Sequence, residues 1–336
     1  MTDAIEQTLQ DLWLDRPDAA AEIERRLADG EITAQQSEKA EAFLNDGFVV
    51  VHLEGIEQTA ERLRREVDQL WRDRRVDLAF RFVEEPTSMA DARPRKDRMA
   101  PCRLLDIHSH SSAALDLYLH QSLFEWVELL LGQPALAFES IFTEFGWSEA
   151  PYRDVVYIET DRVGHLLTAT IALEDIDLAA GPYYVVPGSH RIPLYEFEPG
   201  RVRIRPEEDY LPAQRYAASL AAEQGLLEHE LFLRKGEAVL WHPALIHGAR
   251  RILRPWVTRR TFAVRFTTRG PHPCRRSSYW KSVRGRLWKK EKRLYWKETS
   301  RLLERHGLAG LDNPLRGLNP RGLGLLGKIR NRLRRR

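Results

Sequence analysis

The sequence predicts a mainly β protein with helical additions, organised around an antiparallel sandwich or barrel of jelly-roll type. From about residue 137 to residue 268, short β-rich runs alternate with turn signals such as Pro187-Gly188-Ser189. They lack the regular strand–helix alternation that a parallel sheet requires. Clear helical periodicity precedes this region, and a basic, helix-compatible stretch follows it. We therefore expect three parts: an N-terminal helical segment (1–46), a β-rich domain (47–268) and a basic helical C-terminal extension (269–336).

The N-terminal part carries helix boundaries that can be read directly. Thr33 and Gln36 have the spacing of a capping box, and Asn45-Asp46-Gly47 is a stop signal. A strand is expected at 48–51, followed by a helix over 56–71, where apolar residues recur at helical spacing. The polar, aperiodic residues 84–100 predict a long loop, which would be either a lid or a disordered excursion.

The β-rich domain contains five runs that favour strands. A polar insert, roughly 206–228, is expected to form a helix between them. The five runs are 155–158, 166–176, 183–186, 237–241 and 261–267.

Composition limits the class of protein. The 336 residues are 43% hydrophobic, which is enough for a sizeable core, and no apolar run of about 18 residues predicts a membrane span. The N-terminus lacks the apolar stretch of a secretory signal, and the two cysteines, Cys102 and Cys274, are expected to be reduced thiols in a cytoplasmic protein. The net charge of +3 hides an asymmetry, because residues 271–336 hold 20 Lys and Arg but only four acidic residues.

Several ordered motifs lie between about residues 43 and 266. They are Arg-Leu-Leu-Asp-Ile-His-Ser (103–109), Ile-Ala-Leu-Glu-Asp-Ile-Asp (171–177), Gly-Pro (181–182), Val-Pro-Gly-Ser-His-Arg (186–191) and Gly-Glu-Ala-Val-Leu-Trp-His-Pro-Ala-Leu-Ile-His-Gly (236–248). In these motifs the chain resembles the phytanoyl-CoA dioxygenase family of iron(II)/2-oxoglutarate-dependent oxygenases. The resemblance implies a double-stranded β-helix, which is a cupin-like jelly roll.

The resemblance also implies a site. Such an oxygenase holds iron(II) with two histidines and one carboxylate, and an arginine pairs with the far carboxylate of 2-oxoglutarate. Residue by residue, the carboxylate falls on Asp154 and the distal histidine on His247. The anchoring arginine falls on Arg259, twelve residues after His247, with Arg260 as the alternative. Thr170, which stands where the family has tryptophan, is assigned to the cofactor region.

The near histidine of the family is replaced by Tyr152, two residues before Asp154. A tyrosine with its ordinary pKa of about 10 is a neutral phenol, so we expect iron binding to be weakened or lost. A third departure, after Thr170 and Tyr152, is Ala249, where a small hydroxyl residue often follows the His-Gly pair. Three other histidines could replace the missing ligand: His165, His190 and His242.

Two functions remain open from the sequence. The resemblance implies oxidative decarboxylation of 2-oxoglutarate coupled to hydroxylation of a small organic or lipid-like substrate. The alternative is a non-catalytic binding or scaffold relative that has lost iron. Residues 277–336 interleave Trp and Tyr with basic residues, which suits an anionic membrane surface and a peripheral location. A solvated basic face is the simpler interpretation, and no nucleic-acid recognition motif is present.

Overall fold

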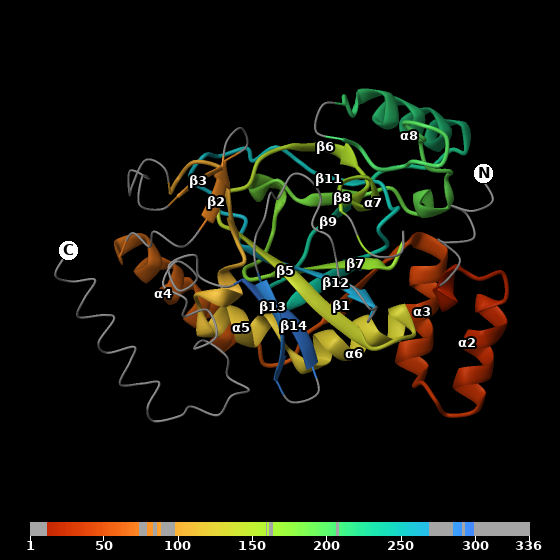
Figure 1. The fold of residues 1–336 in the computed structure, drawn as a ribbon, viewed down its shortest axis with the longest axis horizontal. Coiled ribbons are helices and arrows are strands. Elements are labelled where there is room, and N and C mark those ends of the chain that lie inside the picture. Colours follow the sequence, from red (N-terminus) through yellow and green to blue (C-terminus); the bar gives the residue numbers. More distant parts are fainter. Residues whose placement is uncertain are drawn as a thin grey trace.

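Two sheets face one another at the centre of the molecule (Figure 1). The computed structural model describes residues 12–73, 79–82, 86–88, 98–158, 160, 164–205, 208–268, 285–290 and 293–298. The larger sheet runs in the order β1 (Phe48–His52), β10 (Glu237–Trp241), β7 (Leu166–Ala172), β12 (Thr261–Thr268), β5 (Ala135–Thr143), β4 (Cys102–Leu105), β2 (Ala79–Phe82) and β3 (Pro86–Ser88), with β14 (Arg293–Glu298) beside β5 and β13 (Gly285–Lys290) beside β14. The smaller sheet runs in the order β6 (Glu149–Tyr152), β11 (His247–Ala249), β8 (Tyr183–Val185) and β9 (His229–Leu231). The expected jelly-roll architecture is confirmed.

Helices cover the outside of both sheets. The α-helices are α2 (Ala19–Ala28), α3 (Ala34–Asp46), α4 (Glu57–Asp73), α5 (Ser112–Tyr118), α6 (Gln121–Leu131), α7 (Asp154–Tyr157) and α8 (Leu211–Glu223). Four 3-10 turns complete the order: η1 (Trp13–Asp15), η2 (Ile107–Ser109), η3 (Leu178–Ala180) and η4 (Ser189–Arg191). In Figure 1, α5 and α6 lie against the larger sheet and α8 lies on the side of the smaller one. Within the described residues, none of the helices combines the length and the apolar character that crossing a membrane requires.

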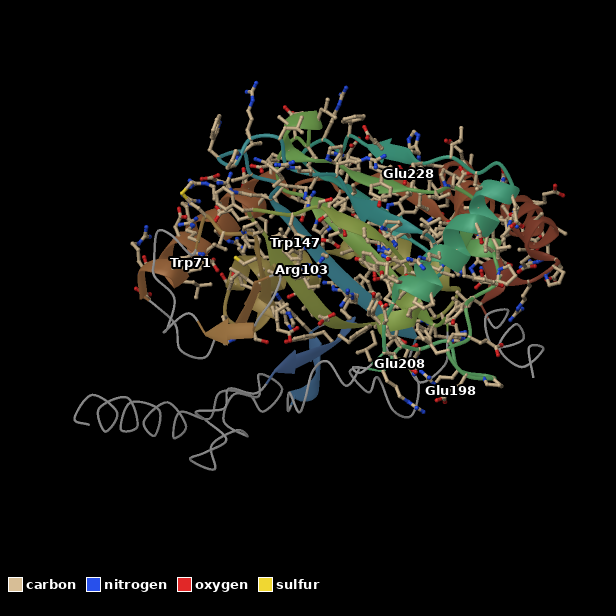
Figure 2. The ribbon with its side chains drawn as sticks, turned by 90° about the horizontal axis from the view of Figure 1, so that it is seen from above. Trp71, Arg103, Trp147, Glu198, Glu208 and Glu228 are labelled. Carbon is tan, nitrogen blue, oxygen red and sulfur yellow. The ribbon has the colours of Figure 1, made fainter. Side chains whose placement is uncertain are left out.

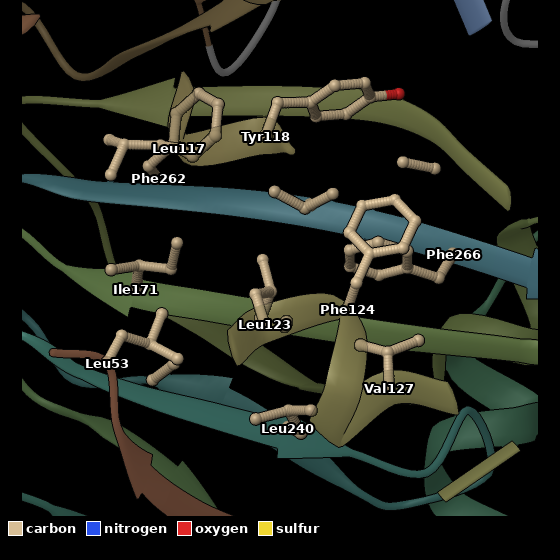
Figure 3. Packing of buried hydrophobic residues seen from close by; sticks show 14 of the residues in the cluster. Leu53, Leu117, Tyr118, Leu123, Phe124, Val127, Ile171, Leu240, Phe262 and Phe266 are labelled. Carbon is tan, nitrogen blue, oxygen red and sulfur yellow. The ribbon is translucent and has the colours of Figure 1, made fainter. Parts of the chain in front are cut away.

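The main core lies between the larger sheet and the helices beneath it (Figure 3). Side chains such as Phe262 and Phe266 of β12 pack against Leu123 and Phe124 of α6. The rings of Phe124 and Phe266 meet edge to face, with centroids 5.3 Å apart and an interplanar angle of 88°. This buried layer fixes the larger sheet as a rigid platform.

The opposite face of the larger sheet looks towards the smaller sheet. Because strand side chains alternate, Phe262 and Phe266 point to the helices while Thr261, Ala263 and Arg265 point inward. An apolar cluster from both sheets fills one part of this interior, and it includes Ala172, Val185, Leu231, Val239 and Trp241. Polar and charged side chains line the rest, which is where the candidate site lies.

The helix boundaries read from the N-terminal sequence are confirmed. Thr33 caps α3 in a capping box, in which the Thr33 hydroxyl accepts from the Gln36 amide and the Gln36 side chain accepts from the Thr33 amide. The helix ends at Gly47, whose φ of 79° is a left-handed conformation that glycine adopts without strain. The helix expected over 56–71 is α4, and the insert expected near 206–228 contains α8.

One strand expectation is wrong. Residues 155–158 were expected to extend, but Asp154–Tyr157 form the short helix α7. The amide of Ile158 donates to the carbonyl of Asp154 at 2.9 Å, and the amide of Val155 donates to Pro243 at 3.0 Å. A run of β-branched residues favours a strand locally, yet here contacts with the 242–244 loop decide the conformation.

The expected helical C-terminal extension is also wrong where the chain is described. Residues 285–290 and 293–298 form the hairpin β13–β14, and Leu294 and Tyr295 align with Leu136 and Ala137 of β5. Pairing with the sheet edge and burial of Tyr295 offset the helix preference of the basic residues. The rest of the extension, and most of the loop expected at 84–100, lie outside the described residues; within that loop Pro86–Ser88 is the strand β3.

Phe266→Ala should lower the free energy of unfolding by about 3–5 kcal/mol, because the cavity left against Phe124 cannot be filled by its neighbours. Urea denaturation monitored by circular dichroism would measure the change. Leu227, which is 80% exposed, provides the control, since Leu227→Ala should shift stability by no more than about 0.5 kcal/mol. Equal effects of the two variants would contradict the assignment of the core.

Candidate functional site

Tyr152, Asp154 and His247 converge in the interior between the sheets. Tyr152 ends β6 and pairs directly with His247, the first residue of β11. Asp154 follows two residues later at the start of α7. The Nε2 atom of His247 lies 3.9 Å from Oδ1 of Asp154, and the rings of Tyr152 and His247 have centroids 4.3 Å apart. The structure therefore brings together the three positions to which the family resemblance assigned the metal.

The ring of His247 is held in one tautomer. Its Nδ1 lies 2.9 Å from the carbonyl oxygen of Leu245, which can only accept, so Nδ1 carries the hydrogen. In the neutral ring the lone pair is then on Nε2, which is buried and has no hydrogen-bond partner. The indole of Trp241 packs against the ring at a centroid distance of 4.7 Å. A buried acceptor without a partner marks a position where a ligand belongs.

The carboxylate of Asp154 is fixed by donors from the larger sheet. Its Oδ2 accepts from the hydroxyl of Thr168 at 2.7 Å and from the indole nitrogen of Trp241 at 2.9 Å. Burial acts to raise the pKa of Asp154, but His247, Arg265 and these two donors outweigh it, so the pKa lies below its ordinary value. The carboxylate is therefore ionised, and its Oδ1 faces His247.

Tyr152 adds little to this pair as a ligand. Burial raises the pKa of its phenol well above the ordinary value of about 10, and the charges of Glu149 and Asp154 raise it further. The side chain is neutral at physiological pH and places an aromatic ring beside His247. The expectation of a neutral phenol at this position agrees with the structure.

The other histidines do not replace the missing ligand. Each of them has another partner. Nε2 of His242 lies 3.3 Å from Oδ1 of Asp15, and Nδ1 of His165 lies 2.7 Å from Oγ1 of Thr268. Nε2 of His190 lies 3.2 Å from the carbonyl oxygen of Leu44. Among the described residues, no group of three or more His, Cys, Asp or Glu side chains is placed to hold a metal ion. Among the described histidines and carboxylates of this region, His247 and Asp154 face one another.

An arginine that the sequence analysis did not single out lies beside this pair. Arg265, on the inner face of β12, forms an ion pair with Glu139 on the adjacent strand β5. Its Nη2 atom lies 3.8 Å from Oδ1 of Asp154, and its Nε is buried without a partner. The sequence did contain a signal for Arg265. Residues 261, 263 and 265 share one face of the strand predicted over 261–267, and Arg259 continues the same spacing before it.

Arg259 lies in the wall of the same interior and is fully buried. Its guanidinium donates to the carbonyl oxygens of Gly181, Trp147 and Arg250, and it lies over the ring of Tyr183. A side chain at Gly146 would overlap with the guanidinium, so glycine is required there for this close approach. Only Nε of Arg259 has no partner.

Arg260 is excluded as the inward anchor. Its guanidinium pairs with Glu144 and Glu174, on the other side of the strand from Arg259. Arg259 therefore keeps the position that the resemblance assigns to a 2-oxoglutarate anchor, although backbone carbonyls occupy most of its donors.

A second, partly buried ion pair lies near Arg259. Arg103 of β4 pairs with Glu149 of β6 and stacks over the ring of Trp147, its neighbour in Figure 2. Burial acts to raise the pKa of Glu149, but Arg103, Arg259 and His247 outweigh it, so the pKa is lowered and the carboxylate is ionised. Thr170 lies on the inner face of β7, two residues beyond Thr168. Charges of both signs are thus already paired in the interior between the two sheets.

The residues present fit a metal ion that takes two protein ligands. Two donors that bind a metal at neighbouring positions with bonds of about 2 Å lie about 3–3.4 Å apart, so the 3.9 Å between Nε2 of His247 and Oδ1 of Asp154 would have to shorten slightly on binding. The carboxylate of Asp154 is ionised, as metal binding requires, and His247 would bind through a deprotonated Nε2. The neutral phenol of Tyr152 makes a poor third ligand, and the charge of Arg265 opposes a cation.

Comparison with known proteins agrees with this fold. The family model described as Phytanoyl-CoA dioxygenase (PhyH) matches residues 43–255. Phytanoyl-CoA dioxygenase domain-containing protein 1 of rat is 30% identical over 109 residues, which is 32% of this chain and 36% of the rat protein. The mouse protein of the same name is 31% identical over 103 residues, 31% of this chain and 34% of the mouse protein. The matches thus span about a third of the length of these relatives.

Two solved structures share the fold. The epimerase SnoN from nogalamycin biosynthesis, in complex with Fe³⁺, α-ketoglutarate and nogalamycin RO, aligns with a TM-score of 0.53 and 18% identity over 78% of this chain and 98% of its own. EctD from S. alaskensis with 2-oxoglutarate and 5-hydroxyectoine aligns with a TM-score of 0.50 and 20% identity over 70% of this chain and 76% of its own.

Asp154→Asn should change how stability depends on pH in metal-free protein. Because the pKa of Asp154 is lower in the folded protein than in the unfolded chain, its carboxylate stabilises the fold above about pH 4, and that stabilisation is lost as the pH falls further. The free energy of unfolding, measured with urea across this range, should therefore fall less steeply with acid in the variant. Asp18→Asn, at an exposed position, should leave the slope unchanged, and a wild-type slope in Asp154→Asn would refute the assignment.

Proposed function

Since the chain belongs to the phytanoyl-CoA dioxygenase family, we propose that it is a 2-oxoglutarate-dependent hydroxylase of a small organic or lipid-like substrate, with a metal centre reduced to two protein ligands. Asp154 and His247 would hold the iron. Iron and 2-oxoglutarate are the cofactors of this family, and together they supply the oxidising power for hydroxylation.

The observation that carries the proposal is the buried, unpartnered Nε2 of His247 facing the ionised Asp154. Leaving such an acceptor unsatisfied costs about 1–3 kcal/mol, so the arrangement favours an occupant between the two side chains. Thr168 and Trp241 hold the carboxylate in one orientation, and the Leu245 carbonyl holds the imidazole in the tautomer that can bind a metal.

Other side chains would surround the bound cofactors. Tyr152 and Trp241 place aromatic rings on both sides of His247, which limits the access of water to the pair. Arg259, with its unpartnered Nε, and the nearby Arg103 give one wall a positive character that suits a dicarboxylate. Because Arg259 already donates to three carbonyls, binding 2-oxoglutarate through it requires some of these bonds to be exchanged.

A second function is favoured by the internal ion pairs. Arg265 places a positive charge next to Asp154, and Glu149 places a negative charge next to Arg103 and Arg259. Arg265 thus balances the charge of Asp154 where a metal cation would, and Glu149 balances Arg103 and Arg259 where a dicarboxylate would. The charges of this interior are therefore balanced by the protein alone. The alternative is therefore a relative that binds a small molecule in this cavity without iron and without turnover.

Tyr152→His separates the two functions. It should raise the affinity for Fe²⁺ by about 10–100-fold, because it supplies a third, imidazole ligand beside an intact pair. Anaerobic titration with Fe²⁺ against a coloured chelator would measure the affinity, and succinate release would measure 2-oxoglutarate turnover. His247→Ala should abolish binding in both backgrounds.

Tyr152→Phe is the matched control, since it keeps the ring and removes only the hydroxyl, and its affinity should remain that of wild type. Failure of both the wild-type protein and Tyr152→His to take up Fe²⁺ would rule out the hydroxylase and leave the cofactor-free function.

A further inference from the structure

An exposed loop on the rim of the molecule combines apolar and basic side chains. It connects β11 to Arg259 and β12, and within it Leu253 is 60% exposed and Trp256 is 69% exposed. A turn in which the Val257 amide donates to the Arg254 carbonyl at 2.9 Å closes the loop. Removing large apolar side chains from water lowers the free energy. Exposed apolar side chains that lie together therefore indicate a surface that binds an apolar partner.

A third exposed apolar side chain, Leu178, belongs to the same surface. The Leu253 amide donates to the carbonyl of Ala179 in η3 at 3.0 Å, and η3 presents Leu178, which is 56% exposed. Beneath these residues, Ala180 and Val257 pack in the apolar cluster between the sheets. We call Leu178, Leu253 and Trp256 the rim patch. Its backbone is held in place, because the Arg259 guanidinium donates to the carbonyls of both Gly181 and Arg250.

Two exposed basic side chains, Arg251 and Arg254, belong to the loop that carries the rim patch. They make no ion pair in the described part of the chain. By contrast, Arg250 is paired with Glu228 and Glu230. The nearby acidic residues are engaged locally: Asp175 accepts from the Lys235 amide, and Asp177 caps η3.

We propose that the rim patch binds an anionic lipid surface. Trp256, Leu253 and Leu178 would enter the boundary between headgroups and acyl chains, where the amphipathic indole is favoured, while Arg251 and Arg254 contact the anionic headgroups. The excess of basic residues in 271–336 has the sign that would strengthen this attraction. An interfacial mode is consistent with the absence of a spanning helix among the described residues.

Flotation of the full chain with lipid vesicles tests the proposal. The probe is a phosphatidylcholine vesicle containing about one third phosphatidylserine, compared with phosphatidylcholine alone. The wild-type chain should float with the anionic vesicles, and added salt should weaken its binding by screening. Arg251→Gln combined with Arg254→Gln should reduce the partition coefficient about 30-fold, since each arginine near such a surface contributes about fivefold. Leu253→Ser combined with Trp256→Ser should reduce it by at least about tenfold.

Matched controls keep the outcome interpretable. Arg215→Gln and Leu227→Ser change exposed residues elsewhere and should float like the wild type. Unchanged flotation of both loop variants would overturn the proposal and assign any vesicle binding to the C-terminal extension. A fall in oligomer size of the Leu253→Ser/Trp256→Ser variant by light scattering, without a change in flotation, would also overturn it and indicate that a second copy covers the patch.

Discussion

The ionised carboxylate of Asp154, buried between two sheets, is the constraint on which the rest of the site depends. A buried charge is costly unless hydrogen bonds and nearby charges compensate for it. Here β7 supplies Thr168, β10 supplies Trp241 and β12 supplies Arg265, so three adjacent strands must keep their register for Asp154 to remain ionised. The helices packed behind the sheet hold that register. In the smaller sheet, the pairing of β6 with β11 places His247 opposite Tyr152, and Nε2 of the imidazole has no partner.

Charged side chains in the interior between the sheets are paired with one another. The Arg265–Glu139 and Arg103–Glu149 pairs balance charges within the interior, and each links neighbouring elements of the sandwich. Such buried pairs are weak evidence for added stability, but removing one partner would leave an uncompensated charge. Beside them, Asp154 and His247 face one another next to the ring of Tyr152. Whether the pair binds iron then depends on the balance between the open imidazole and the neighbouring guanidinium.

The elements with strong local signals could be predicted from the sequence. The periodic apolar stripe of α4, the capping box of α3 and the alternating strands β10 and β12 all follow from local residue patterns. The hairpin β13–β14 and the short helix α7 could not, because contacts with β5 and with the 242–244 loop override local preference. Asp154 and His247 were found through motifs, whereas the three carbonyls around Arg259 come from segments that are distant in sequence.

The most direct measurement is anomalous X-ray diffraction from crystals of the protein soaked anaerobically with Fe²⁺. The account predicts a single anomalous peak within about 2.2 Å of both Oδ1 of Asp154 and Nε2 of His247, with the Arg265 guanidinium turned towards Glu139. A map without a peak at that position, with Arg265 bonded directly to Asp154, would contradict it and show that the arginine has taken the place of the metal.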